Sequence, residues 1–369
     1  MIGLSSVLMN RANEKETVVV LGGYGAVGAA VCEALVLNCR VVVAGRDFDK
    51  AQHMARRLGE QAEAAQLDTT APSTYRDLLK RASVVVNCVE HNNFAVAEQC
   101  LAHSVHYVDV SASADVISQL QTLDSSAKSA NATVVFSVGV APGLTNLLVD
   151  HAQSRLGPLK RADIFVLLGL GESHGAAAIQ WTLKQFGHKF SVKTDGARKE
   201  VSAFCEGLST TMPEPFGRRT GYRFNFSDQH TLPATLGIES VNTWLCFDSR
   251  AVTRILWCLA KSQLLSVLPL WRWSNTISKL SQWVPMGGTQ FAVQVDAIGG
   301  NESTNRFTLT GDGEADVTGH VAAHVAGYLL SSSAPPGALH LEQLMNLEML
   351  LEMLGNRLFV TESVSEPGM

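Results

Sequence analysis

The sequence predicts an α/β fold with a doubly wound parallel sheet and a second domain. Two observations lead to this prediction. From Thr17 to Val138, short apolar runs alternate with helical patterns, and such alternation is typical of a mainly parallel sheet with helices on both faces. The chain of 369 residues is also long for one domain, so we expect a second one.

A glycine-rich turn follows the first predicted strand. Gly23, Gly25 and Gly28 have the G-x-G-x-x-G spacing. We expect the first to make the tight turn, the second to let backbone approach a pyrophosphate, and the third to let the next helix, Ala26 to about Leu37, pack closely. The alternative is a turn that binds nothing. Because strand and helix flank the motif, we predict a Rossmann domain. Its expected dinucleotide-binding residues are Gly23, Tyr24, Gly25, Ala26, Val27 and Gly28.

The end of the second predicted strand, Arg40–Ala44, is where such a fold selects its cofactor. Gly45, Arg46 and Asp47 follow the strand. An arginine at this place can pair with a 2′-phosphate, which favours NADP. Asp47 leaves NAD possible because a carboxylate there would bind the ribose 2′-OH. It is otherwise the N-cap of the next helix, Asp49–Leu58.

The central predicted strand, Ser83–Val89, is apolar and ends in small residues. Ligands bind at the carboxyl ends of strands in open α/β sheets, so we expect Cys88 and Val89 beside the nicotinamide ribose. Glu90 and His91 follow directly. Their position makes them candidates for handling a proton, and the alternative is a solvated loop.

Other elements complete the first domain. Asp68 closes a short strand, Ala64–Asp68, and is placed either near the adenine ring or in a plain turn. Helices are predicted at Thr70–Lys80, Phe94–His103 and Asp115–Ala130, and strands at His106–Ser111 and Thr133–Val138.

Four motifs, in order, resemble the saccharopine dehydrogenase-like (saccharopine reductase-like) oxidoreductases. They are GGYGAVG after a strand, VVNCV, HYVDVS and the turn SVGVAPGLTN, and their order and spacing agree from Val18 to Asp150. The stretches Gly311–Ala315 and Pro336–His340 fit the C-terminal part of the family. The middle of the chain resembles it only loosely.

This resemblance implies an NAD(P)-dependent Rossmann domain, an inserted α+β substrate domain and often a homodimer. Relatives reduce imines formed between an amine and a carbonyl, or oxidise secondary amines. Asp109, in the Y-x-D pattern, matches the family's acidic active-site position, although a structural cap at the next helix is the other reading of it. Ala141 stands where saccharopine reductases carry an acidic residue before the turn's proline. The resemblance therefore does not extend to a substrate with saccharopine's amino and carboxyl groups.

The first domain is expected to comprise 1–142 plus 315–369, and the substrate-binding and dimerisation domain 143–314. Within the second domain, the Gly-rich loop Gly169–Gly175 contains His174. We expect this loop to face the cleft, which makes His174 a further catalytic candidate; the alternative is an ordinary exposed histidine. Strands are predicted at Ala162–Leu168, Val241–Phe247, Thr289–Ile298 and Arg306–Thr310, the last two as an antiparallel pair.

Two C-terminal helices, Val317–Leu330 and Leu339–Leu354, are expected to return to the first domain, with a polar tail after Val360. The segment 251–284 is rich in leucine and tryptophan. It is interpreted as core or a subunit interface, as a wall around an apolar substrate, or as a membrane-surface helix. Its charged residues interrupt any span of bilayer length, so we do not expect membrane contact.

Net charge, cysteine spacing and the first fifteen residues exclude some classes of function. The formal net charge of −5 argues against nucleic acid as a partner. The seven cysteines are scattered without a metal-binding spacing, which favours reduced thiols in a cytoplasmic protein and no metal site. The first fifteen residues lack a signal-peptide cleavage pattern.

These observations predict an NADP-dependent oxidoreductase. It would transfer hydride at a C–N or carbonyl centre of a small amino-acid-derived metabolite, and the catalytic candidates are Asp109, His174, Glu90 and His91. The alternative is a catalytically silent dinucleotide-binding sensor or scaffold.

Overall fold

The computed structural model describes residues 16–172, 176–194, 196–262, 287–300, 304–331 and 334–364. Contacts divide the chain into two compact units. One unit runs up to Ser111 and adds Ser118–Phe136 and Gly319–His340. The other comprises Ala112–Ile117, Ser137–Thr318 and the part from Leu341 onward.

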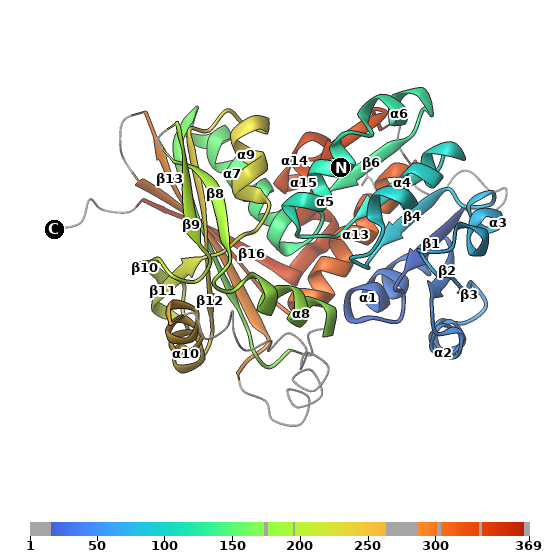
Figure 1. The fold of residues 1–369 in the computed structure, drawn as a ribbon, viewed down its shortest axis with the longest axis horizontal. Helices are drawn as coiled ribbons and strands as arrows, with labels where there is room; N and C mark the ends of the chain where they lie inside the picture. The colour runs from blue at the N-terminus through green and yellow to red at the C-terminus, as the bar shows by residue number, and fades with distance from the viewer. Residues whose placement is uncertain are drawn as a thin grey trace, which may run out of the picture. The chain divides into compact units, whose positions relative to one another are not determined.

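The first unit is built on a seven-stranded sheet in which every pairing is parallel (Figure 1). Its order is β15-β6-β5-β4-β1-β2-β3. The strands are β1 (Thr17–Leu21), β2 (Arg40–Gly45), β3 (Ala62–Gln66), β4 (Val84–Asn87), β5 (His106–Asp109), β6 (Thr133–Phe136) and β15 (Gly337–His340). The valines of the central strands have no exposed surface, as expected for a sheet covered on both faces. The predicted fold class is confirmed.

Helices connect these strands. They are α1 (Ala26–Leu35), α2 (Phe48–Leu58), η2 (Pro72–Thr74), α3 (Arg76–Leu79), α4 (Asn93–Ala102), α5 (Ala114–Gln121), α6 (Asp124–Ser129) and α13 (Glu314–Ser331). Two predicted helices are shorter than expected. Thr74 and Thr122 donate from their hydroxyls to the carbonyls of Ala71 and Gln119, and such side-chain bonds compete with helix continuation. Thr70–Lys80 is therefore η2 and α3, and Asp115–Ala130 is α5 and α6.

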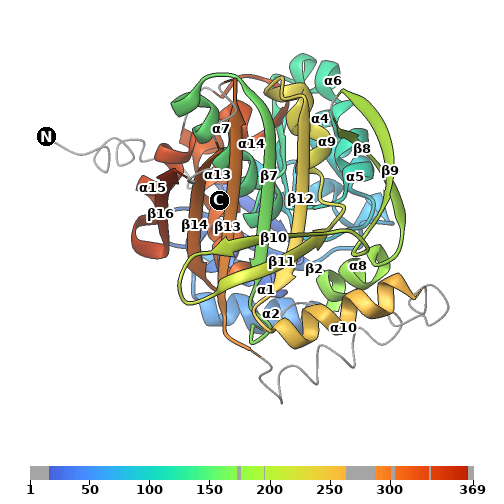
Figure 2. The ribbon, with the colours of Figure 1, turned by 90° about the vertical axis from the view of Figure 1, so that its left-hand side faces the viewer.

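The second unit contains a mixed seven-stranded sheet of order β10-β11-β12-β7-β13-β14-β16. Its strands are β7 (Leu159–Leu168), β10 (Gly207–Met212), β11 (Gly217–Arg223), β12 (Ser240–Phe247), β13 (Gln290–Gly299), β14 (Thr304–Asp312) and β16 (Leu358–Val364). Figure 2 shows β10 and β11 crossing one face of the long strands. There Met212 and Phe216 pack on Phe165, Leu167 and Trp244. The predicted antiparallel pair is confirmed as β13 and β14.

The remaining elements of this unit are a hairpin and several helices. They are β8 (Lys189–Thr194), β9 (Ala197–Ser202), η3 (Val140–Leu144), α7 (Thr145–Leu156), α8 (Ala176–Gln185), α9 (Asp228–Thr235), α10 (Arg250–Lys261), α14 (Leu341–Leu344), α15 (Leu347–Leu354) and η5 (Gly355–Arg357). Of the segment 251–284, only its beginning is described, as part of α10. No helix among the described residues is both long and apolar enough to cross a membrane.

The prediction of one helix over Leu339–Leu354 is wrong. Residues up to His340 form β15, which pairs with β6, and the Asn346 side chain accepts from the Met349 N–H to begin α15 as a separate helix. The expected polar tail contains β16, which pairs with β14 of the second sheet. The two units differ from the expected division 1–142 plus 315–369 and 143–314, because residues 112–117, 137–142, 315–318 and those from Leu341 onward belong to the second unit.

Candidate functional site

The glycine turn between β1 and α1 is more crowded than its motif implies. The left-handed φ of +75° is at Gly22, not at Gly23, where the sequence placed the tight turn. A Cβ on Gly28 would lie 2.2 Å from the Gly22 carbonyl oxygen. The predicted close packing by the third glycine is therefore confirmed, and Gly22 belongs to the motif because only glycine adopts this φ easily.

The N-terminus of α1 is suited to an anion. Its N-cap is Gly25, which provides no side-chain cap, and its first turn contains no acidic residue. The first N–H groups of a helix lack intrahelical partners and carry the positive end of the helix dipole. A pyrophosphate fits this end, because such N–H groups bind phosphate without a competing carboxylate.

The tip of β2 is shaped by Tyr24 from the glycine turn. A Cβ on Gly45 would lie 2.4 Å from the Tyr24 ring, and the Tyr24 hydroxyl accepts from the Asp47 N–H at 3.2 Å. Asp47 is the N-cap of α2, because its carboxylate accepts from the Lys50 N–H at 3.1 Å. The Lys50 ammonium also pairs with it. Arg46 remains exposed at the tip.

Asp68 lies in a turn. Its Oδ1 accepts from the N–H and the hydroxyl of Thr70 at 2.9 and 2.7 Å. These bonds lower the pKa of Asp68, and the charge of Arg46 lowers it further. Asp68 therefore closes a turn, and its place near an adenine ring stays a prediction.

Asp109, at the end of β5, is fully buried and surrounded by donors. Its Oδ2 accepts from the Tyr107 hydroxyl at 2.7 Å and from the amides of Asn93 and Asn87 at 2.8 and 3.0 Å. Its Oδ1 accepts from the Ser111 N–H at 2.8 Å. Both oxygens are thus bound by the protein. Burial raises the pKa of Asp109, against the effect of these four bonds, and burial beside Asp109 also raises the pKa of Tyr107.

The same two asparagines hold the loop after β4. Asn87 and Asn93 each donate to the Val89 carbonyl as well as to Asp109, at 2.9 and 3.3 Å for the carbonyl. The loop between them contains Glu90 and His91. We call Asn87, Asn93 and Asp109 the asparagine clamp. It links the end of β5 to the loop that follows β4.

The clamped loop also reaches the glycine turn. A Cβ on Gly22 would lie 2.8 Å from Cγ1 of Val89 and 3.3 Å from the Cys88 carbonyl. Cys88 and Val89 are half-buried, and burial together with the charge of Asp109 raises the pKa of the Cys88 thiol. The structure thus brings the motifs GGYGAVG, VVNCV and HYVDVS together in one unit.

The four catalytic candidates have different surroundings. Glu90 is half-buried and His91 is exposed. Asp109 has no exposed surface, and His174 lies outside the described residues. Sequence reasoning assigned no role to Asn87, Asn93, Tyr107 or Gly22. A polar Asn87 at the end of an otherwise apolar strand was the available signal.

The fourth motif lies in the second unit. Its turn contains Gly143, whose N–H donates to the Asn146 side chain, and Asn146 donates to the Glu342 carboxylate at 3.0 Å. The other oxygen of Glu342 accepts from the Thr235 hydroxyl at 2.9 Å. Burial raises the pKa of Glu342 to about 6.

Comparisons with known proteins give a family match for part of the chain and a similar fold for most of it. Residues 18–135 match the family model of the saccharopine dehydrogenase NADP-binding domain. An apo saccharopine dehydrogenase (L-Glu forming) from Saccharomyces cerevisiae has a similar structure, with a TM-score of 0.67 and 15% identity over 95% of this chain and 100% of that chain. For GenD2 from gentamicin A biosynthesis, in complex with NAD, the TM-score is 0.39 and the identity 16%, over 82% and 74% of the two chains.

The fold, the glycine turn and the matched domain define an NAD(P)-dependent oxidoreductase with a nicotinamide dinucleotide cofactor. More narrowly, residues 18–135 match the saccharopine dehydrogenase NADP-binding domain, and the fold of the chain is similar to that of a saccharopine dehydrogenase.

Proposed function

We propose that this protein uses NADP(H) to transfer hydride at an imine, secondary-amine or carbonyl centre of a small amino-acid-derived metabolite. The observation that supports NADP over NAD is the difference between the surroundings of Arg46 and those of Asp47. Asp47 is engaged as a helix cap, whereas Arg46 is exposed at the strand tip. A guanidinium there suits a 2′-phosphate better than a bare ribose.

The residues would hold the cofactor as follows. Gly23–Gly28 receive the pyrophosphate at the N-terminus of α1, and Arg46 pairs with the 2′-phosphate. Cys88 and Val89 lie beside the nicotinamide ribose. The bound cofactor supplies the hydride or accepts it.

The protein must then move one proton. Glu90 and His91 are proposed for this role because the clamped loop carries them, with His174 as a further candidate. Asp109 is proposed as a positioning residue. Its two oxygens are occupied by protein donors, so its effect on catalysis passes through the loop held by Asn87 and Asn93. A donor or acceptor held within hydrogen-bond reach contributes roughly 10²–10⁴-fold in rate.

Cofactor choice is tested by Arg46→Ala, with Arg40→Ala at the other end of β2 as the control. Losing charge-assisted bonds of about 1.5–3 kcal/mol should weaken NADPH binding on the order of 10- to 100-fold. NADH affinity should stay within about twofold, since NADH lacks the phosphate. Fluorescence titration measures both, and equal losses for the two cofactors would contradict the assignment.

Turnover is tested by absorbance of the reduced nicotinamide with candidate amine and carbonyl pairs. Among His91→Asn, Glu90→Gln and His174→Asn, we expect the proton-handling residue to lower kcat and change the pH profile. Asp109→Asn should lower kcat without removing a pH-dependent limb, as expected for positioning. Normal NADPH binding without turnover on any pair would favour the silent sensor or scaffold instead. The homodimer stays a prediction, and light scattering would test it.

A further inference from the structure

Four arginines gather around one groove of the second unit. The groove encloses about 490 Å³ and is lined by Arg218, Arg219, Thr220, Tyr222, Arg250, Thr253, Arg254 and Trp257. The first four of these residues come from β11 and the last four from α10 or its start. The protein as a whole has a formal net charge of −5. The groove is therefore positively charged on a protein whose net charge is negative.

Helical spacing places the α10 residues on one face. Arg250, Thr253, Arg254 and Trp257 stand at i, i+3, i+4 and i+7, which is one stripe of a helix. The stripe faces β11, because the Trp257 ring stacks on Tyr222 with centroids 5.8 Å apart and planes inclined by 21°. The Trp257 Nε1 donates to the Cys205 carbonyl at 3.3 Å, which fixes the ring. The groove is therefore a built feature of the fold.

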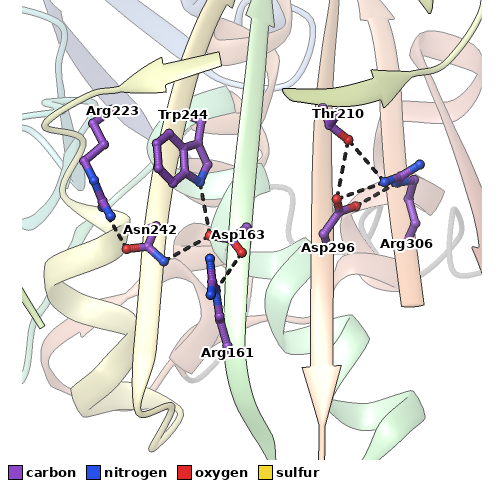
Figure 3. A network of polar contacts seen from close by, with 8 residues as sticks. All are labelled: Arg161, Asp163, Thr210, Arg223, Asn242, Trp244, Asp296 and Arg306. Atoms are coloured by element: carbon purple, nitrogen blue, oxygen red, sulfur yellow. Dashed lines mark hydrogen bonds and ion pairs between the residues drawn. The ribbon is translucent and has the colours of Figure 1, made fainter. Parts of the chain in front are cut away.

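Other arginines of the same unit form ion pairs with carboxylates. In Figure 3, Arg161 donates to Asp163 at 2.8 Å, and Arg306 forms two bonds to Asp296 at 2.7 and 2.9 Å. Each of these guanidinium groups has a carboxylate partner. The groove contains the same residue type, so it differs from these sites in whether the guanidinium has a carboxylate partner.

The groove arginines have no such compensation. Among the described residues, none of Arg218, Arg219, Arg250 and Arg254 forms an ion pair. The charge of Asp248 acts against the burial that lowers the pKa of Arg219, but the hydrogen bonds that its carboxylate accepts come from three backbone N–H groups, those of Leu170, Ser249 and Gly288.

Arg219 shows the consequence most clearly. Two of its nitrogens donate to the carbonyls of Arg218 and Asp248, and its buried Nε has no partner. Burial lowers the pKa of Arg219, and the charge of Arg250 lowers it further. Like charges brought together without an anion destabilise a fold. A buried donor without an acceptor costs a further 1–3 kcal/mol or so.

We propose that this groove binds a phosphate-bearing ligand. Guanidinium forks match phosphate oxygens in bidentate geometry, and a phosphate brings the negative charge that the groove lacks. The stacked Tyr222 and Trp257 provide an apolar floor for the carbon part of the ligand. The ligand is either a soluble phosphate compound or the headgroup of an anionic lipid, because both present the same phosphate oxygens. All lining residues lie in the second unit, so the proposal does not depend on the nucleotide site.

The full-length chain, with excess NADPH to fill the glycine turn, is titrated calorimetrically with inorganic pyrophosphate. It is also sedimented with vesicles of phosphatidylcholine containing phosphatidic acid, and with phosphatidylcholine alone. The variant is R250Q/R254Q. The control K193Q/R198Q removes the same charge from the exposed face of the β8–β9 hairpin. Circular dichroism verifies folding, and R250K/R254K retains the charge without the forks.

We expect R250Q/R254Q to lose at least about tenfold in affinity, the control to stay within about twofold, and R250K/R254K to fall between them. Pyrophosphate binding without vesicle binding identifies a soluble ligand, and vesicle binding that the variant abolishes identifies a headgroup. The proposal is overturned if neither probe binds. It is also overturned if R250Q/R254Q binds like the wild type, or if only Arg46→Ala reduces pyrophosphate binding.

Discussion

Two charged regions of this protein differ in how their charge is compensated. In the first unit, the carboxylate of Asp109 has no exposed surface and accepts four hydrogen bonds. In the second unit, the arginines of the groove have no ion-pair partner among the described residues. A buried group whose bonds are all made within the chain positions its neighbours, and its loss leaves their donors unsatisfied. A charge left without partners is available to a ligand. Stability and binding measurements should therefore separate the two regions.

The largest effect is expected for Asp109→Ala. It removes the acceptor shared by four buried donors, on Asn87, Asn93, Tyr107 and Ser111, and removing one partner of a buried charged network costs about 3–5 kcal/mol. Denaturant unfolding measures the loss. Asp109→Asn keeps one acceptor oxygen and should lose less. A loss below about 1 kcal/mol for the alanine variant would show that Asp109 does not hold the clamp.

The next largest loss of stability is expected for Arg306→Leu, because the Arg306 guanidinium forms an ion pair with Asp296. Its side chain is 24% exposed and that of Asp296 16%, so we expect a loss of about 2 kcal/mol, below that of a fully buried pair. The double variant Arg306→Leu/Asp296→Leu should regain much of it, since no unpaired charge remains. A double variant as unstable as the single one would mean that packing, and not charge, is responsible.

The Glu342 carboxyl accepts hydrogen bonds from two side chains but has no ion-pair partner among the described residues. Burial raises its pKa to about 6 from an ordinary value near 4.5. Below about pH 4.5 the carboxyl is protonated in both states. As the pH rises through 6, the unfolded chain ionises more readily than the folded one, so stability falls by about 2 kcal/mol. Glu342→Gln should remove this loss, with a gain in unfolding free energy above pH 6 and none below pH 4.5. A gain independent of pH would contradict the buried-carboxyl explanation.

The smallest effect on stability is expected for R250Q/R254Q. Removing two uncompensated charges should change the unfolding free energy by no more than about 0.5 kcal/mol, or raise it slightly at low salt. Thermal unfolding at two salt concentrations measures this, with K193Q/R198Q as the control. A loss comparable to that of Arg306→Leu would mean that these arginines are structural.

Prediction from the sequence succeeded where the signals are local. The first strand, the glycines and α1 follow one another closely in the chain, and the alternation of strands with helices predicted the parallel sheet of the first unit. The glycine turn was predicted, but its left-handed residue was misplaced by one position. The helix predicted at Leu339–Leu354 failed because its first residues pair, as part of β15, with the distant strand β6.

The sequence by itself therefore determined the Rossmann-type sheet and the class of cofactor, since apolar periodicity and glycine spacing act over a few residues. Only the tertiary structure decided which charges have partners. Asp109 obtains its donors because β4 lies beside β5 in the sheet, and the groove forms because α10 packs its arginine stripe against β11. These contacts join residues that are distant in the chain, so no local sequence pattern predicts them.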